Sequence, residues 1–218
     1  FYYQSRRDGW NHIYQFNTKN KQINQITKGY WEVTELLGFD EKEENIFYEA
    51  TKESPIGRHL YKQNLHSATA IKLSNDAGTH SGILSPDRKY IIDQWSSTDI
   101  PGQLDLISTS TKHQKILFEA ENTLKNYDLG ENTTFTIKAA DGITDLFCRM
   151  IKPNNFDPSK KYPVIVYVYG GPHAQLVNKT WHNDARWWQY YMASKGYIAF
   201  TVDSRGSANR GSAFENVI

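Results

Sequence analysis

The chain has 218 residues and a formal net charge of +1, from 25 Lys and Arg against 24 Asp and Glu. Because the charges are balanced and spread along the chain, there is no basic stripe of the kind that nucleic acid or anionic lipid selects. No apolar run approaches the roughly 18 residues of a membrane-spanning helix, and a single cysteine, Cys148, excludes an internal disulfide framework.

Short β-rich runs recur about every 45 residues through the first half of the chain. They form three sets, which are Phe1–Gln4, Ile46–Glu49 and Tyr90–Asp93; His12–Phe16, His59–Lys62 and Leu104–Ile107; and Ile23–Thr27, Ala70–Leu73 and Lys115–Phe118. Strands at this period fit the four-stranded blades of a β-propeller better than helical repeats. We predict two to three blades over residues 1–126, with a small β-sandwich of coincidental spacing as the alternative.

The period ends after Tyr127, and residues 127–218 have a different pattern. Thr134–Lys138 and Asp145–Ile151 flank an Asp-Gly turn, which predicts a β-hairpin. Val164–Val168 is then an almost uninterrupted β-branched and aromatic run, as is typical of a central parallel strand covered on both faces. The glycines and proline at 170–172 allow a sharp turn at its carboxyl end, where ligands bind in open α/β sheets.

A helix and a second strand complete a predicted βαβ unit. Aromatic residues at helical spacing indicate a helix from Asn183 to Lys195, with Asn183 or Asp184 as its cap and Gly196 at its end. Tyr197–Val202 is the second apolar strand. The predicted fold is therefore all-β in its first part and α/β in its second.

Several motifs occur together in an order that resembles the dipeptidyl peptidase IV branch of the prolyl oligopeptidase family. They are Arg7–Tyr14, Ile26–Val33 and Gly57–Tyr61 in the repeat region, then Tyr169-Gly-Gly-Pro-His173 and Asp203-Ser-Arg-Gly-Ser207. The resemblance covers essentially the whole chain. It implies the C-terminal blades of a β-propeller over residues 1–126 and the N-terminal part of an α/β-hydrolase domain over residues 127–218, and we expect the chain to be an internal fragment.

The resemblance also implies a serine peptidase that releases N-terminal Xaa-Pro or Xaa-Ala dipeptides through an acyl-enzyme. Its serine lies on a Gly-x-Ser-x-Gly elbow, and no such elbow occurs in this sequence. In the family the serine, aspartate and histidine of the triad all follow the position of Ile218. We therefore expect this fragment to be inactive by itself.

One catalytic element is expected within the chain. The family places a tyrosine hydroxyl in the oxyanion hole at the position of Tyr169, and a positioned donor of this kind is worth about a hundredfold or more in rate. From residue chemistry alone, a tyrosine packed at a strand end with its hydroxyl satisfied is the alternative. We further expect Pro172 and His173 to line the leaving-group side of the cleft.

Metals, cofactors and the amine site are the remaining questions. The seven histidines lack the short spacing of a zinc site, so we expect neither metal nor cofactor. The glutamates that hold the substrate amine in the family precede Phe1. Glu41, Glu43 and Glu44 are a tempting substitute, but they fit a solvated charge run better.

The partners, location and alternatives follow from the same resemblance. We expect peptide substrates, no nucleic acid, a homodimeric parent protein, and a periplasmic, extracellular or membrane-anchored location. An acylaminoacyl peptidase or oligopeptidase of the same clan is the nearest alternative. A catalytically dead, propeller-based interaction protein and a self-contained binding module are the others.

Overall fold

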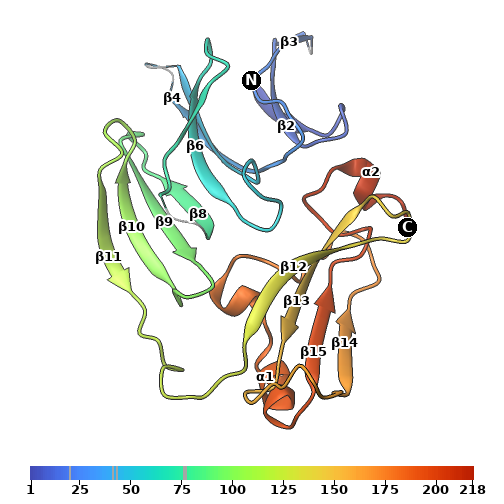
Figure 1. Ribbon diagram of the computed structural model, residues 1–218. Helices are drawn as coiled ribbons and strands as arrows, with labels where there is room; N and C mark the ends of the chain where they lie inside the picture. The colour runs from blue at the N-terminus through green and yellow to red at the C-terminus, as the bar shows by residue number, and fades with distance from the viewer. Residues whose placement is uncertain (20, 41, 43, 76–77) are drawn as a thin grey trace.

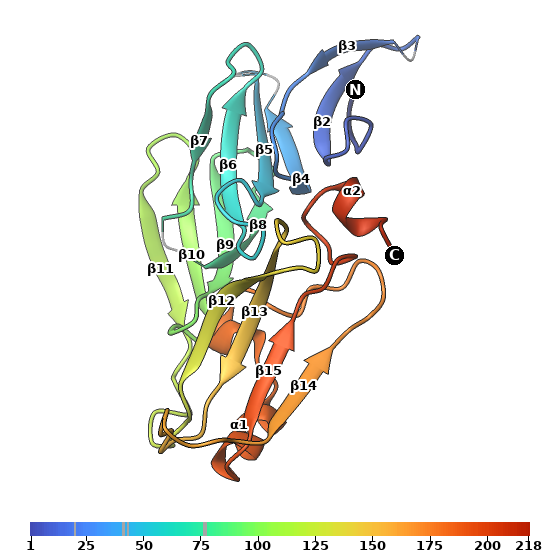
Figure 2. The ribbon, with the colours of Figure 1, turned by 45° about the vertical axis from the view of Figure 1, so that its right-hand side comes forward.

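The computed structural model describes residues 1–19, 21–40, 42, 44–75 and 78–218. Their strands form four sheets, of which three lie within the first 119 residues and one in the rest of the chain (Figure 1). Figure 2 shows the same division after rotation, with the blue-to-green sheets across the top and left and the yellow-to-red sheet below them. The predicted boundary at residues 126 and 127 falls in the connection between them and stays a prediction.

The first three sheets are antiparallel meanders. They consist of β1 (Tyr2–Ser5), β2 (His12–Phe16) and β3 (Gln22–Gln25); then β4 (Val33–Asp40), β5 (Asn45–Ala50), β6 (His59–Asn64) and β7 (Ala70–Lys72); and then β8 (Thr79–Leu84), β9 (Tyr90–Ser96), β10 (Gln103–Ser108) and β11 (Gln114–Glu119). This is the arrangement of consecutive β-propeller blades, which confirms the predicted fold of the first part. The two four-stranded blades each begin with a strand, β4 or β8, that the sequence pattern missed.

The same arrangement of side-chain hydrogen bonds occurs in the first and second sheets, and it accounts for part of the sequence repeat. His12 Nδ1 lies 3.1 Å from the Thr27 hydroxyl, which also accepts the N–H of the residue after His12 at 2.9 Å. His59 Nδ1 lies 2.9 Å from the Ser74 hydroxyl, which accepts the N–H of the residue after His59 at 3.1 Å. In both sheets the bond joins the start of one strand to the segment after the next strand, so a histidine and a hydroxyl residue recur at the same blade positions.

Apolar clusters hold neighbouring blades face to face. One cluster is shared between the second and third blades and consists of Phe47, Leu60, Leu73, Ile91 and Ile107. Another is shared between the first and second blades and contains Ile13, Ile26, Val33, Ile46, Tyr48, Ala50 and Tyr61. Burial of one face of each sheet against the next is the main stabilising contribution expected of such a stack.

The fourth sheet has the order β12-β13-β15-β14 and contains the predicted hairpin and βαβ unit. Its strands are β12 (Asn132–Lys138), β13 (Asp145–Ile151), β14 (Val164–Val168) and β15 (Ile198–Val202), and its helical elements are η1 (Trp181–Asp184), α1 (Trp187–Ser194) and α2 (Ser212–Glu215). β14 and β15 pair in parallel, while the other pairs are antiparallel. None of the described helices is long and apolar enough to cross a membrane.

Within residues 1–218, the predicted burial of Val164–Val168 on both faces, as in a central strand, is not observed. β14 lies at the edge of the sheet, and Val164, Val166 and Val168 are 54%, 58% and 50% exposed. An apolar run indicates which side chains favour burial, while the number of neighbouring strands depends on the rest of the sheet, of which residues 1–218 supply four strands.

The predicted start of the helix is also wrong. The α-helix begins at Trp187 with Arg186 as its N-cap, and Asn183 and Asp184 lie in η1 with positive φ. Asn183 does not cap a helix, because its side-chain oxygen accepts the Thr98 hydroxyl at 2.8 Å. The end of the helix at Lys195 and Gly196 is as predicted, with Gly196 at φ +88°.

Candidate functional site

The loops that leave β14 and β15 lie against turns of all three blades. Each contact is a backbone hydrogen bond, and the bonds are Ser212 N–H to Gly9 O (2.8 Å), Lys179 N–H to Ile56 O (2.7 Å) and His182 N–H to Thr98 O (3.2 Å). The carboxyl ends of the two parallel strands therefore face the blades, and this is the edge at which an α/β sheet places its ligand sites.

Tyr169 is the first residue after β14, and its side chain folds over the following turn. A Cβ atom added to Gly171 would lie 2.8 Å from Tyr169 Cε1 and 3.2 Å from its hydroxyl oxygen. Only a glycine at position 171 therefore lets the ring take this place. Tyr169 is 52% exposed, and none of the residues that the structure describes hydrogen-bonds its hydroxyl. The alternative of a buried tyrosine with a satisfied hydroxyl does not fit this placement.

His173 closes the same turn, and Pro172 is exposed beside it. His173 has φ +65°, its N–H donates to Gly206 O at 2.9 Å, and its Nδ1 lies 3.2 Å from Glu215 Oε2. The structure therefore brings Tyr169, Pro172 and His173 together on one short loop. Their expected roles toward a substrate stay predictions.

Asp203, at the end of β15, fixes the continuation of this loop. Its two carboxylate oxygens accept the backbone N–H groups of Leu176 at 2.8 Å and of Val177 at 3.1 Å. Asp203 is buried, and this burial raises the pKa of its carboxyl group above the ordinary value, against the opposing effect of the two N–H donors and of Arg149.

Arg149, on β13, is the buried cation behind the loop. It donates to Leu176 O at 2.7 Å, Asn183 O at 2.5 Å, Gln189 Oε1 at 3.1 Å and Thr201 Oγ1 at 3.2 Å. Burial lowers the pKa of its guanidinium. Arg149 thus joins the loop after β14, η1, α1 and β15 into one rigid support.

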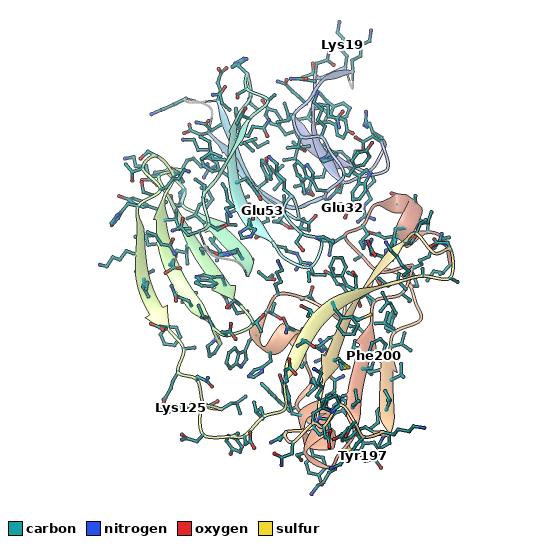
Figure 3. The ribbon with its side chains drawn as sticks, viewed as in Figure 1. Lys19, Glu32, Glu53, Lys125, Tyr197 and Phe200 are labelled. Atoms are coloured by element: carbon teal, nitrogen blue, oxygen red, sulfur yellow. The ribbon has the colours of Figure 1, made fainter. Side chains whose placement is uncertain are left out.

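An ionic cluster connects this support to the first blade. Arg6 Nη1 contacts Glu215 Oε2 at 2.5 Å, and Arg6 Nη2 contacts Glu32 Oε2 at 3.2 Å. The other oxygen of Glu215 accepts the Asn209 N–H at 3.0 Å. Glu215 and Glu32 are buried, and burial raises the pKa of Glu32 although Arg6 opposes the shift. Figure 3 labels Glu32 on the side of the blades nearest α2.

A hollow of about 830 Å³ lies between β4, β8 and the loop at Asn209. Arg6, Glu32, Glu49 and Arg58 are among the residues that line it. Burial raises the pKa of Glu49, whose carboxylate accepts the N–H of the third blade's Gly82 at 3.0 Å. The volume is within the range of small-molecule sites.

The remaining expectations concern acidic groups and metals. Glu41 and Glu43 lie outside the described residues, and Glu44 is exposed and contacts His66 at 2.7 Å. In the part of the chain that the structure describes, no group of three or more His, Cys, Asp or Glu side chains converges to hold a metal.

Sequence reasoning did not identify Arg6, Asp203 or Glu215 as parts of the site. For Asp203 a signal was present, since an acidic residue directly follows a buried strand whose parallel neighbour ends in a glycine turn. For Arg6 and Glu215 there was none, because they are 209 positions apart.

Comparisons with known proteins agree on one family. The model of the family described as the dipeptidyl peptidase IV (DPP IV) N-terminal region matches residues 1–102. Dipeptidyl peptidase 4 of the fungus Arthroderma otae is 33% identical over 224 residues, covering 98% of this chain and 28% of that protein. Dipeptidyl peptidase 4 of Trichophyton rubrum is 32% identical over 222 residues, with the same coverage of 98% and 28%.

Two solved structures have the same fold over nearly the entire chain. Dipeptidyl peptidase 4 of Porphyromonas gingivalis matches with a TM-score of 0.91 and 32% identity, over 99% of this chain and 30% of that one. A Bacteroides ovatus protein, named as a candidate dipeptidyl aminopeptidase IV, matches with a TM-score of 0.92 and 43% identity, over 100% of this chain and 34% of that one. The chain thus spans about a third or less of the length of these relatives.

Proposed function

The chain belongs to the dipeptidyl peptidase IV family, and from this we propose that residues 1–218 are part of a serine peptidase that releases N-terminal dipeptides. We assign residues 127–218 to the N-terminal part of its α/β-hydrolase domain. The catalytic serine, aspartate and histidine are proposed to lie outside residues 1–218. These residues alone are then inactive, and they supply the support for one half of the oxyanion hole.

The half-exposed Tyr169 side chain, with its hydroxyl free of any described hydrogen-bond partner, is the observation that carries this proposal. Tyr169 lies at the carboxyl end of a parallel strand, and no described residue forms a hydrogen bond with its hydroxyl. The next turn is fixed by His173 N–H to Gly206 O, and the following residues are fixed by Asp203. A donor held in place before the reaction stabilises a developing negative charge without having to reorganise.

The chemical role of this phenol is the stabilisation of a tetrahedral intermediate. When the serine oxygen attacks the scissile carbonyl, the carbonyl oxygen becomes an oxyanion, and the Tyr169 O–H donates a hydrogen bond to it. A backbone N–H beside the serine is the second donor in this proposal. The bond strengthens as charge develops, so it contributes to the rate of acylation more than to substrate binding.

The proposed substrates are peptides with a free N-terminal amine and proline or alanine in the second position. The amine is proposed to bind glutamates that lie outside this chain. Pro172 and His173 are proposed to contact the leaving group, because both are exposed on the turn that follows Tyr169.

The test is chromophore release from Gly-Pro arylamide by the full-length gene product. We expect release that is lost when the substrate amine is blocked with an acetyl group. Release only from the acetylated substrate would instead indicate an acylaminoacyl peptidase, and cleavage only within longer peptides would indicate an oligopeptidase. A folded protein that cleaves none of these would support the catalytically dead interaction protein.

The parent protein is further proposed to be a homodimer that is exported or membrane-anchored. Sedimentation velocity of the full-length protein should give the mass of two chains, and cell fractionation should find it outside the cytoplasm. A monomeric or cytoplasmic protein would contradict the respective part of this proposal without affecting the peptidase assignment.

A further inference from the structure

We propose that Glu215 is a positioning residue, which uses Arg6 of the first blade and His173 of the strand-end turn to fix the loop that carries Tyr169. This inference rests on the proposed peptidase function. It concerns a contact between the blades and the α/β part of the chain, so it assigns the propeller a direct part in shaping the oxyanion hole.

The contacts of Glu215 place it at the centre of this arrangement. One carboxylate oxygen, Oε2, is 2.5 Å from Arg6 Nη1 and 3.2 Å from His173 Nδ1. The other oxygen accepts the Asn209 N–H at 3.0 Å. Both oxygens are therefore engaged, and the side chain is completely buried. A carboxylate held in this way has little freedom to move, so it can fix the groups that it contacts.

His173 transmits this constraint to Tyr169. Its backbone has φ +65°, a conformation that non-glycine residues adopt only when their surroundings enforce it. The N–H bond to Gly206 O and the side-chain contact with Glu215 are two such enforcing contacts. Only three residues separate His173 from Tyr169, so a change at His173 moves the turn over which the tyrosine ring is folded.

Arg6 makes the position of Glu215 depend on the first blade. Its guanidinium lies between two buried carboxylates, those of Glu32 and Glu215. Without this cation the two carboxylates would be buried without a shared counter-charge, which is costly in a low-dielectric site. The side chain of Arg6 is 40% exposed, so it can be replaced without leaving a large internal void.

The experiment is a double-mutant cycle between Glu215→Gln and Tyr169→Phe in the full-length protein, measured as kcat and KM on Gly-Pro arylamide. Glu215→Gln should lower kcat about tenfold with KM nearly unchanged. The reason is that a displaced Tyr169 hydroxyl no longer donates its hydrogen bond to the oxyanion in the transition state. In the Tyr169→Phe background the same change should have an effect of less than about twofold, because the two residues act through one interaction. Equal losses in both backgrounds, or an unchanged kcat in folded Glu215→Gln, would overturn the proposal.

Arg6→Ala repeats the cycle if Glu215→Gln does not fold, and it should show the same dependence on Tyr169. Arg7→Ala is the matched control, since it removes the same charge from the same turn, while Arg7 stacks on the Tyr14 ring at 4.6 Å. It should leave kcat unchanged. A loss of kcat in Arg7→Ala equal to that in Arg6→Ala would contradict the specific role of Arg6.

Hydrogen exchange of the His173 backbone N–H, which donates to Gly206 O at 2.9 Å, tests the pairing without any activity. Exchange in Glu215→Gln, or in Arg6→Ala where that variant is needed, should be at least about tenfold faster than in the wild type if the contact limits opening of the turn. Unchanged exchange would overturn the positioning role. A wild-type protein that cleaves no substrate would contradict the proposed peptidase function. The hydrogen-exchange result would still decide whether Glu215 fixes the loop.

Discussion

The carboxylate of Asp203 accepts the backbone N–H of Leu176 at 2.8 Å, and this bond ties the end of β15 to the loop that leaves its parallel neighbour β14. The second oxygen binds the next N–H along the chain. The two N–H donors favour the ionised carboxylate and so oppose the upward shift of the Asp203 pKa that burial causes. The same loop carries Tyr169 and His173, so a strand-end residue without a proposed chemical role supports the residues that have one.

Replacement of Asp203 tests this support. Asp203→Asn keeps the size of the side chain but turns an N–H₂ group toward one of the two backbone donors, which leaves a buried donor unsatisfied. The free energy of unfolding of the full-length protein should fall by about 2 kcal/mol, as measured by urea titration. Asp145→Asn is the control, because Asp145 forms an exposed pair with Lys138 at 2.8 Å and such pairs contribute little. A destabilisation no larger than that of the control would contradict the role of Asp203.

Acid should destabilise the protein through His59. Burial is the largest cause that lowers the pKa of His59 to about 4, and His80, Lys72 and Lys179 act in the same direction, whereas Glu53 opposes them. The unfolded chain binds a proton near the ordinary value of 6.5, while the folded chain does not until about pH 4. Stability from this group is therefore complete above pH 6.5 and is lost as the pH falls toward 4, with a loss of about 3 kcal/mol.

The measurement for His59 is the unfolding free energy of the wild type and of His59→Gln between pH 7 and pH 4. The wild type should lose stability faster than the variant over this interval, because glutamine does not titrate. Parallel pH profiles of the two proteins would show that His59 is protonated as easily in the folded state as in the unfolded one.

The strands of the first sheet and the second to fourth strands of the two four-stranded blades were predictable from the sequence, and the first strands of those two blades, β4 and β8, were not. Strands such as β2 and β6 have β-branched and aromatic residues and tight turns, so local preference and structure agree. β4 has irregular register at two places, which removes the alternation that reveals a strand. β8 begins with small and polar residues, and the Gly82 N–H donates a hydrogen bond to the carboxylate of Glu49 in the neighbouring blade. Such strands depend on contacts between blades.

The residues of the candidate site also fall into some that were predictable from the sequence and some that were not. Tyr169 and His173 were identified because they lie within one short motif, and the structure places them on one turn. Glu215 and Arg6 gain their importance only when the fold brings residues from opposite ends of the chain into contact. A burial pattern also could not reveal the ionic cluster, since Glu215 lies in a short helix among exposed residues.

A glycine in the connection between β11 and β12 should be essential for stability. A Cβ atom on Gly130 would lie 1.8 Å from the backbone oxygen of Lys152, which cannot move without shifting the end of β13. Gly130→Ala should therefore lower the free energy of unfolding by about 2 kcal/mol or more. Gly102→Ala is the control, because its nearest neighbour would be the Ala120 side chain at 3.8 Å. Equal melting temperatures of the two variants would contradict the predicted clash.

Removal of the Tyr169 hydroxyl should reduce catalysis with little effect on binding. Tyr169→Phe keeps the ring that folds over Gly171 and deletes the O–H, so kcat on Gly-Pro arylamide should fall about a hundredfold or more with KM within a few-fold of the wild type. Tyr167→Phe is the matched control, since Tyr167 lies on β14 two residues before Tyr169 and its ring packs edge-on against Trp188 of α1 at 5.8 Å. It should keep the wild-type kcat. A Tyr169→Phe enzyme with unchanged kcat would show that another group donates to the oxyanion, and the exposed phenol would then be left as a contact for the substrate.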